Sequence, residues 1–232
     1  MRVGYFQDAL PFAFVNESGK LVGFDIEMAA MLAQEMDVKL ELVPIDRARA
    51  PAMLDSGTVD IIMSGLAVTV DTARNMTLSA SYMDQTLAFI VKDHRREEFN
   101  SRERVKNLKR LRIGVPNVPY YAGKVRQYLP QAELVVLDTP RAYFTRKEDD
   151  LDALVYSAEA GSAWSLIYPA YTVAIPEPDV LRVPMAYAVR RGDRELVDFL
   201  NVWIELKRKD RRIAELYDYW ILGGGAERSE SR

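Results

Sequence analysis

Short apolar runs rich in β-branched residues alternate with stretches of helical periodicity along this chain. Residues 2–6 have the composition of a strand, the stretch from Asp25 to about Met36 has an apolar helical face, and Val38–Val43 has the pattern of a second strand. A strand followed by a helix and a second strand is the repeating unit of mostly parallel sheets. The alternation therefore predicts an α/β fold.

Later segments continue the pattern. The further predicted elements are a short helix over Ala48–Leu54, a strand over Val59–Met63, a β run that follows Val180 and ends at Val189, and a last helix over Ile213–Trp220. The helix predicted after Gly192 and Asp193 is strongly amphipathic. Its expected core-facing residues are Leu196, Phe199, Leu200, Trp203 and Leu206.

The chain contains a weak internal echo. Arg2-Val3-Gly4 recurs as Arg112-Ile113-Gly114, and the segment 59–64 recurs loosely as 151–157. Two similar α/β lobes would produce such an echo, although chance is a rival explanation for matches of a few residues. The charged stretch from His94 to Lys109 lies between the copies and is expected to be solvated.

Composition narrows the range of partners. The 31 Lys and Arg residues are intermixed with 34 Asp and Glu residues, for a net charge of -3. No basic face is predicted, so a small solute is a better expectation than nucleic acid. The absence of cysteine excludes disulfides and thiolate sites, and it is compatible with an oxidising or a reducing compartment.

No apolar run reaches the roughly 18 residues of a membrane span, and no signal peptide precedes the first strand pattern. We expect either a cytoplasmic protein or a secreted one whose leader has been removed, and we favour the second. The polar residues 223–232 are expected to form a flexible tail.

Catalytic motifs are missing. The single histidine, His94, lies in a charged run without a serine nucleophile turn, and no phosphate-cradling loop or dinucleotide fingerprint occurs. Acid pairs such as Asp25 with Glu27, or Asp149 with Asp150, are interpreted as solvated helix surface. We therefore predict no catalytic residue, no metal and no cofactor.

One segment is diagnostic of a family. Gly23-Phe24-Asp25-Ile26-Glu27-Met28-Ala29 resembles the Gly-Phe-Asp-hydrophobic-Asp/Glu segment of the bacterial extracellular solute-binding proteins, family 3, which have the type II periplasmic-binding fold. Other motifs agree in order and spacing over nearly the full chain. They are Arg49 to Leu54, Ser56-Gly57, Val59-Asp60, Gly65 to Thr69, Ser79 to Tyr82, Ile113 to Val115, Asp152 to Val155 and Tyr187 to Asp193.

The resemblance implies an α/β clamshell of two lobes, with residues 1–90 and 184–222 in lobe one and residues 91–183 in lobe two. Two crossing strands would form the hinge, and a small solute would be bound without chemical conversion in the interlobe cleft. It also implies a periplasmic or extracellular, monomeric domain that works with a membrane transporter, either fused or separate.

The residues implied for ligand binding depart from the family pattern. Thr72 stands where the resemblance implies a carboxylate-clamping arginine, and Ser157 where it implies an ammonium-binding aspartate. Arg74 and Glu159, each two residues further on, are possible replacements, although a solvated helix glutamate is the simpler interpretation of Glu159. Three further family features are replaced at Ala67, at Val118-Pro119-Tyr120 and, roughly, at Asp46. The cleft is therefore predicted not to hold an ordinary α-amino acid, because a buried zwitterion without charge partners is unstable.

We predict that the solute is an organic anion if Arg49 or Arg74 faces the cleft. Arg47 and Tyr156 are weaker candidates, and Phe12 and Tyr156 have the alternative of being core. The candidate ligand-binding residues are Phe12, Arg49, Ser64, Gly65, Thr69, Thr72, Arg74, Tyr120, Ser157 and Glu159.

Two alternatives remain open at this point. Cyclohexadienyl dehydratases resemble this family, so an enzyme on the same fold is one. The other is a degenerate regulatory domain of a membrane transporter, since Gly161–Pro169 and Tyr217–Gly223 look similar to solute-binding domains fused to cation:dicarboxylate symporters.

Overall fold

The computed structural model describes residues 1–7, 9–16, 18–146, 150–178 and 181–223. The chain forms two compact units, Met1–Asp84 with Val183–Arg232, called lobe one, and Gln85–Arg182, called lobe two. The first boundary lies at Asp84, whereas we expected it near residue 90. Nearly all of the predicted flexible tail lies outside the described residues.

Lobe one is built on a five-stranded sheet of order β4-β1-β5-β13-β6. Its strands are β1 (Arg2–Phe6), β4 (Glu41–Ile45), β5 (Ile61–Ile62), β6 (Thr77–Leu78) and β13 (Ala188–Val189), beside a small hairpin of β2 (Phe14–Val15) and β3 (Leu21–Val22). Strand β1 runs parallel to β4 and β5, whereas β13 is antiparallel to β5 and β6.

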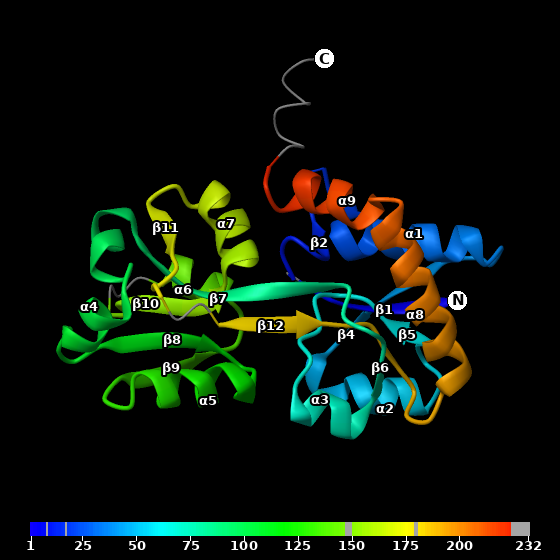
Figure 1. Cartoon of the computed structure of the whole chain (residues 1–232), viewed down its shortest axis with the longest axis horizontal. Helices are drawn as coiled ribbons and strands as arrows, with labels where there is room; N and C mark the ends of the chain where they lie inside the picture. The colour runs from blue at the N-terminus through cyan, green and yellow to red at the C-terminus, as the bar shows by residue number, and fades with distance from the viewer. Residues whose placement is uncertain (8, 17, 147–149, 179–180, 224–232) are drawn as a thin grey trace, which may run out of the picture. The chain divides into compact units, whose positions relative to one another are not determined.

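Helices cover both faces of this sheet. Figure 1 shows α1 and α9 on one side of it and α2 and α3 on the other. One core joins α1, α8 and α9 to the sheet, and a second core joins α2 to the other face. The helices are α1 (Phe24–Glu35), α2 (Ala50–Asp55), α3 (Val70–Asn75), α8 (Arg194–Lys209) and α9 (Arg212–Trp220), with a 3-10 turn, η1 (Arg47–Arg49).

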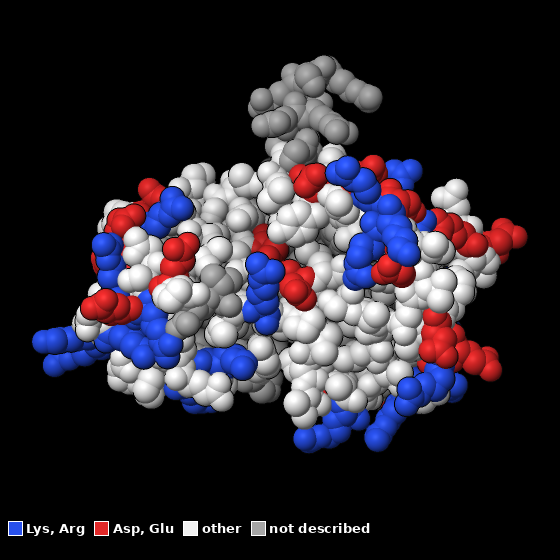
Figure 2. Space-filling view, in the orientation of Figure 1, with Lys and Arg blue, Asp and Glu red and all other residues white. Residues whose placement is uncertain are grey.

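Helix α8 corrects one prediction. Its buried apolar residues are Val197, Leu200, Trp203 and Ile204, whereas Phe199 and Leu206 are 43% and 55% exposed. The apolar stripe that contacts the core is therefore rotated from the predicted one, because α8 carries apolar residues around more of its circumference than the core covers. Acidic and basic side chains are interspersed over α8 and α9 (Figure 2).

Lobe two contains a six-stranded sheet of order β11-β7-β10-β8-β9, with β12 also paired to β7. Its strands are β7 (Met83–Lys92), β8 (Arg112–Pro116), β9 (Glu133–Leu137), β10 (Ala153–Ser157), β11 (Tyr171–Ala174) and β12 (Arg182–Met185). Strand β8 is parallel to β9 and β10, and β7 is antiparallel to β10 and β11. Strands β7 and β12 contain the two points where the chain passes between the lobes.

The helices of lobe two are α4 (Arg102–Asn107), α5 (Pro119–Tyr128), α6 (Arg141–Thr145) and α7 (Ala158–Ile167), with a 3-10 helix, η2 (Asp93–Glu98). Figure 1 shows α5 and α7 on opposite sides of the sheet. No helix in the described ranges is long and apolar enough to cross a membrane.

The internal echo has a structural counterpart. The order β4-β1-β5 in lobe one matches the order β9-β8-β10 in lobe two. The Arg2 amide N–H donates to the Asp60 carboxylate at 2.7 Å, and the Arg112 amide N–H donates to the Asp152 carboxylate at 2.8 Å. The amide N–H of each aspartate donates in return to the arginine carbonyl. The echo therefore marks one structural unit that occurs twice.

The two glycines of the echo are also equivalent. A Cβ atom on Gly4 would lie 2.9 Å from the side chain of Ile45, the last residue of β4. A Cβ atom on Gly114 would lie 3.0 Å from the side chain of Leu137, the last residue of β9. In each lobe the glycine allows the neighbouring strand's last apolar side chain to pack against it.

Candidate functional site

The predicted ligand-binding residues follow the carboxyl ends of the parallel strands. In lobe one Phe12 follows β1, Arg49 follows β4, and the segment Ser64–Arg74 follows β5. In lobe two Tyr120 follows β8, Ser157 ends β10, and Glu159 lies in α7. Ligands of open α/β sheets bind outside this edge. Within each lobe the fold thus brings the predicted residues to one edge of the sheet.

Asp25 corrects the prediction of a solvated acid, because its side chain is fully buried. Its carboxylate accepts hydrogen bonds from the Gly65 amide at 2.6 Å, the Tyr82 hydroxyl at 3.0 Å and the Tyr187 hydroxyl at 3.2 Å. Burial raises the pKa of Asp25 to about 7, and the three donors partly oppose that shift. Asp25 fixes the start of the loop that follows β5.

Gly65 and Phe12 are part of the same structural frame. Gly65 has a φ of 63°, and a Cβ atom there would lie 2.7 Å from the Phe12 ring. Phe12 is buried in the core of lobe one, and its carbonyl accepts from the Asp25 amide. Ser64 is also buried, and its hydroxyl oxygen accepts from the Phe6 amide at 2.9 Å. Phe12 and Ser64 therefore support the lobe-one edge from within the core, and Gly65 lies close against the Phe12 ring.

Thr69 and Thr72 form a capping box at the start of α3. The Thr69 hydroxyl oxygen accepts from the Thr72 amide at 3.1 Å, and the Thr72 hydroxyl oxygen accepts from the Thr69 amide at 2.9 Å. Thr72 therefore serves the backbone at the position where the resemblance implied an arginine. Arg74 is exposed in the last turn of α3 and forms no ion pair within the described part of the chain.

Arg47 is the cation that the structure holds against the lobe-one edge. Its guanidinium lies 3.9 Å from the centroid of the Phe6 ring. Phe6 is the last residue of β1, and its amide donates to Ser64, so Arg47 lies over the end of the central strand. Among the described residues Arg47 and Arg49 form no ion pair, and both are exposed.

The sequence alone favoured Arg49 over Arg47 as the binding cation. Strand register was the missing signal. Phe6 pairs with Ile45 in parallel register. A residue two positions after Ile45 can therefore reach across the end of β1.

In lobe two Ser157 is fully buried and caps α7, with its hydroxyl oxygen accepting from the Ala160 amide at 3.1 Å. Like the Thr72 hydroxyl oxygen, the Ser157 hydroxyl oxygen accepts a hydrogen bond from a main-chain amide. The replacement of an acid by a capping hydroxyl residue leaves this position without a charge.

Glu159 corrects a second prediction, because it is 5% exposed and not solvated. Both carboxylate oxygens lie 3.1 Å from the Thr86 amide nitrogen, which donates to them. Burial raises the pKa of Glu159, and hydrogen bonds from backbone groups and from Thr86 and Ser157 partly oppose the shift. No basic side chain pairs with Glu159 in the parts of the chain that the structure describes.

Tyr120 lies half-buried at the start of α5. Its ring lies 6.0 Å from that of Tyr121, and the Lys124 ammonium lies 5.4 Å from the Tyr120 centroid. Burial raises the pKa of the Tyr120 hydroxyl. Lys124 is thus a cation beside the lobe-two edge that was not predicted from the sequence. Its position one helical turn after Tyr120 was the available signal.

The described residues contain no group of three or more histidines and acids that could hold a metal ion. His94 is exposed in η2. The lobe-one edge carries the exposed guanidiniums of Arg47 and Arg49. The lobe-two edge carries the Glu159 carboxylate and the Lys124 ammonium.

The family model for bacterial extracellular solute-binding proteins, family 3, matches residues 1–223. A curated relative, the L-cystine-binding protein TcyJ of Escherichia coli (strain K12), is 24% identical over 213 residues, which cover 91% of this chain and 78% of that protein. The cyclohexadienyl dehydratase of Pseudomonas aeruginosa is 22% identical, over 95% of this chain and 82% of that protein.

Among solved structures, the ancestral amino acid-binding protein AncCDT-1, described as a precursor of cyclohexadienyl dehydratase, is 28% identical. It superposes with a TM-score of 0.83 over 95% of each chain. The fold of this chain is therefore that of the two-lobed amino-acid-binding proteins.

Proposed function

Because this chain belongs to the bacterial extracellular solute-binding proteins, family 3, we propose that it binds a small organic anion and releases it unchanged. The solute would occupy a cleft between the lobes. A solute that touches both lobes stabilises the closed state, and it can do so only by its greater affinity for that state. The location of the predicted residues at the carboxyl ends of the parallel strands supports a binding site at each lobe's edge.

The position of Arg47 is the observation that favours an anion as the ligand. Its guanidinium is held over Phe6 at the end of β1, and no described acid neutralises it. A planar guanidinium binds a carboxylate through two parallel hydrogen bonds. Arg49 lies two residues further along the same 3-10 turn and adds positive charge.

The two positions where the family resemblance implied charged clamps argue against an ordinary α-amino acid. Thr72 and Ser157 are neutral, and each serves a helix start. Glu159 is an acid at the lobe-two edge, and its carboxylate oxygens already accept a hydrogen bond from the Thr86 amide. Several relatives are named for the amino acids that they bind. An α-amino acid is therefore the alternative ligand that the experiments must distinguish from an organic anion.

We further propose that the protein works in the periplasm or outside the cell and delivers its solute to a membrane transporter, fused or separate. The relatives include a protein named ABC transporter arginine-binding protein 1, which supports this role. The related dehydratase shows that an enzyme occurs among similar proteins. For this chain we expect no phenylpyruvate to form on incubation with prephenate.

A thermal-shift screen tests the proposed ligand class. The compounds are matched pairs that differ by an α-amino group, such as succinate with aspartate and glutarate with glutamate. At a hundredfold excess over Kd a ligand raises Tm by about 5–10 °C. We expect such a shift from an amine-free acid. No shift from any organic acid would contradict the proposal, and so would a shift from the amino acids alone.

Substitution of the two arginines tests where the anion binds. Arg47→Met should abolish the shift caused by the acid, whereas Lys106→Met, which removes an exposed cation from α4 of lobe two, should leave it unchanged. Arg49→Met should reduce the shift by less than Arg47→Met does. Equal shifts in wild type and Arg47→Met would exclude Arg47 as the anchor.

A further inference from the structure

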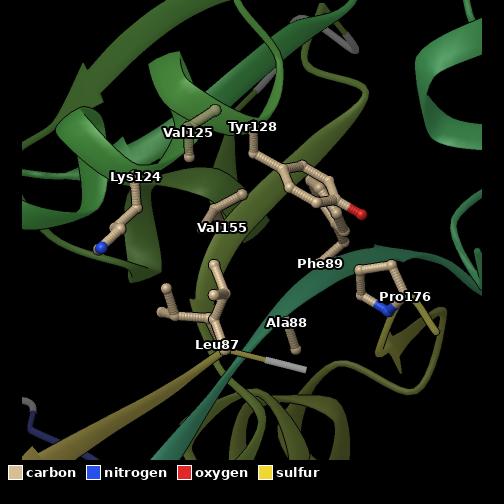
Figure 3. Close-up of a pocket in the computed structure, with 9 residues that line it drawn as sticks. Leu87, Ala88, Phe89, Lys124, Val125, Tyr128, Val155 and Pro176 are labelled. Atoms are coloured by element: carbon tan, nitrogen blue, oxygen red, sulfur yellow. The ribbon is translucent and has the colours of Figure 1, made fainter. Parts of the chain in front are cut away.

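Lobe two contains an apolar pocket between α5 and β7, and none of its lining residues is among those predicted to bind the solute. Figure 3 shows the side chains that surround it. The pocket is lined by Leu87, Ala88, Phe89, Lys124, Val125, Tyr128, Val155, Pro176 and Leu181.

The sheet explains why the pocket exists. Strand β11 ends at Ala174, paired with Phe89, and β12 begins only at Arg182. Between these points the Leu87 amide donates to the Leu181 carbonyl at 2.8 Å, so the chain returns to β7. Leu87 therefore lies at the place on this edge of β7 between its pairing with β11 and its pairing with β12, while its other edge is paired with β10.

The walls of the pocket are well packed. Phe89 is opposite Val155 in the β7–β10 register, and both belong to the core of lobe two. The Tyr128 ring lies 6.4 Å from the Phe89 ring. Leu87, Phe89, Val125 and Val155 are all buried. The base is thus apolar and fixed by the sheet.

One cation lies beside this apolar base. Lys124 is half-buried on α5, and Figure 3 shows it across the pocket from Tyr128. Its contact with the Tyr120 ring is a cation–π interaction, and within the described ranges its ammonium forms no ion pair. Binding sites combine a mainly apolar wall with a few polar groups that set orientation. Here the polar group is positive.

We propose that this pocket is a second binding site, for a small monocarboxylate with an unbranched apolar tail. The tail lies between Leu87, Val125 and Val155, and the carboxylate meets the Lys124 ammonium. The cavity volume is about 40 Å³, roughly three water-sized spheres, which suits a tail of about four carbons. The site does not depend on the solute proposed for the interlobe cleft.

The pocket is connected to the lobe-two edge at two points. Leu87 follows Thr86, whose amide binds Glu159. Lys124 contacts Tyr120, the candidate residue at the start of α5. An occupant therefore touches a residue next to Thr86 and pairs with the cation that lies over Tyr120.

Calorimetric titration with pentanoate, pentylamine and pentan-1-ol tests the proposal on the full chain. We expect saturable binding of pentanoate, weaker binding of pentan-1-ol and none of pentylamine. Each methylene added from propanoate to pentanoate should strengthen binding about fourfold. Lys124→Met should weaken pentanoate binding about tenfold, with partial rescue in Lys124→Arg, while Lys106→Met should have no effect.

Two variants locate the occupant. Leu181→Trp enlarges a side chain at the mouth, and Val125→Phe fills the wall, so each should abolish binding in protein whose circular dichroism remains that of wild type. Arg47→Met separates this site from the solute cleft and should leave pentanoate binding unchanged. Loss of binding in Arg47→Met alone, equal binding of pentylamine, or retention of binding in both pocket variants would overturn the proposal.

Discussion

The two lobes repeat one frame and differ in their buried acids. Asp60 and Asp152 hold the starts of equivalent strands, and Gly4 and Gly114 have equivalent neighbours. Asp25 of lobe one, in contrast, is bound by an amide and two tyrosine hydroxyls in the core, whereas Glu159 of lobe two is bound by an amide at the edge. The repeated frame thus supports edges that have diverged.

Removal of the two buried acids should reveal the largest difference in stability between the lobes. Asp25→Ala leaves the Gly65 amide and the hydroxyls of Tyr82 and Tyr187 without their acceptor, and should lower the free energy of unfolding by about 3–5 kcal/mol. Glu159→Ala removes one main-chain partner and should lower it by about 1–2 kcal/mol. Denaturant unfolding measures both. Equal losses would mean that the two acids have the same structural role.

The dependence of stability on pH should reveal the buried Asp25 of lobe one. Burial raises the pKa of Asp25 in the folded chain to about 7, above the value of about 3.9 expected in the unfolded chain. The folded state then holds the proton more tightly. Its contribution to stability is fully present below about pH 4 and is lost as the pH rises to about 7, with a slope of at most about 1.4 kcal/mol per pH unit.

Asp25→Asn removes this titration while it keeps the shape of the side chain. We expect the slope of stability between pH 4 and 7 to become flatter in that variant than in wild type. An unchanged slope would assign the dependence to other groups, such as Glu159, whose pKa is also raised by burial.

Substitution of two glycines should have opposite effects, because Gly65 lies in a closely packed loop and Gly123 lies on an open helix surface. Gly65→Ala places a Cβ atom against the Phe12 ring at a positive φ, and should cost about 1–3 kcal/mol. Gly123→Ala in α5 meets nothing within 4 Å and should stabilise the chain by about 0.5–1 kcal/mol. Thermal unfolding of both variants gives the signs. A stabilising Gly65→Ala would disprove that the loop after β5 is held in place.

The smallest expected effects concern the two helix caps. Thr72→Ala and Ser157→Ala should each cost about 1 kcal/mol of stability, since each removes a side-chain acceptor at a helix start. Neither variant should weaken the affinity for the solute by more than about threefold. A large loss of affinity with little loss of stability would make that residue a ligand-binding group.

The family and the α/β alternation could be predicted from the sequence because both depend on local pattern and short motifs. The burial of Asp25 could not, since its tyrosine partners lie 57 and 162 residues away. The core-facing side of helix α8 was predicted correctly at Leu200 and Trp203 and wrongly at Phe199 and Leu206, because an apolar pattern wider than the contact does not fix the rotation of the helix. Arg47 was underrated because strand register decides which side chain lies over Phe6.

Titration calorimetry with glutarate and glutamate, on wild type and Arg47→Met, tests the central claim most directly. The two ligands differ only in the α-amino group. We predict that wild type binds glutarate at least as tightly as glutamate and that Arg47→Met binds neither. Tight binding of glutamate with no binding of glutarate, retained in Arg47→Met, would contradict the assignment of an anion site anchored by Arg47.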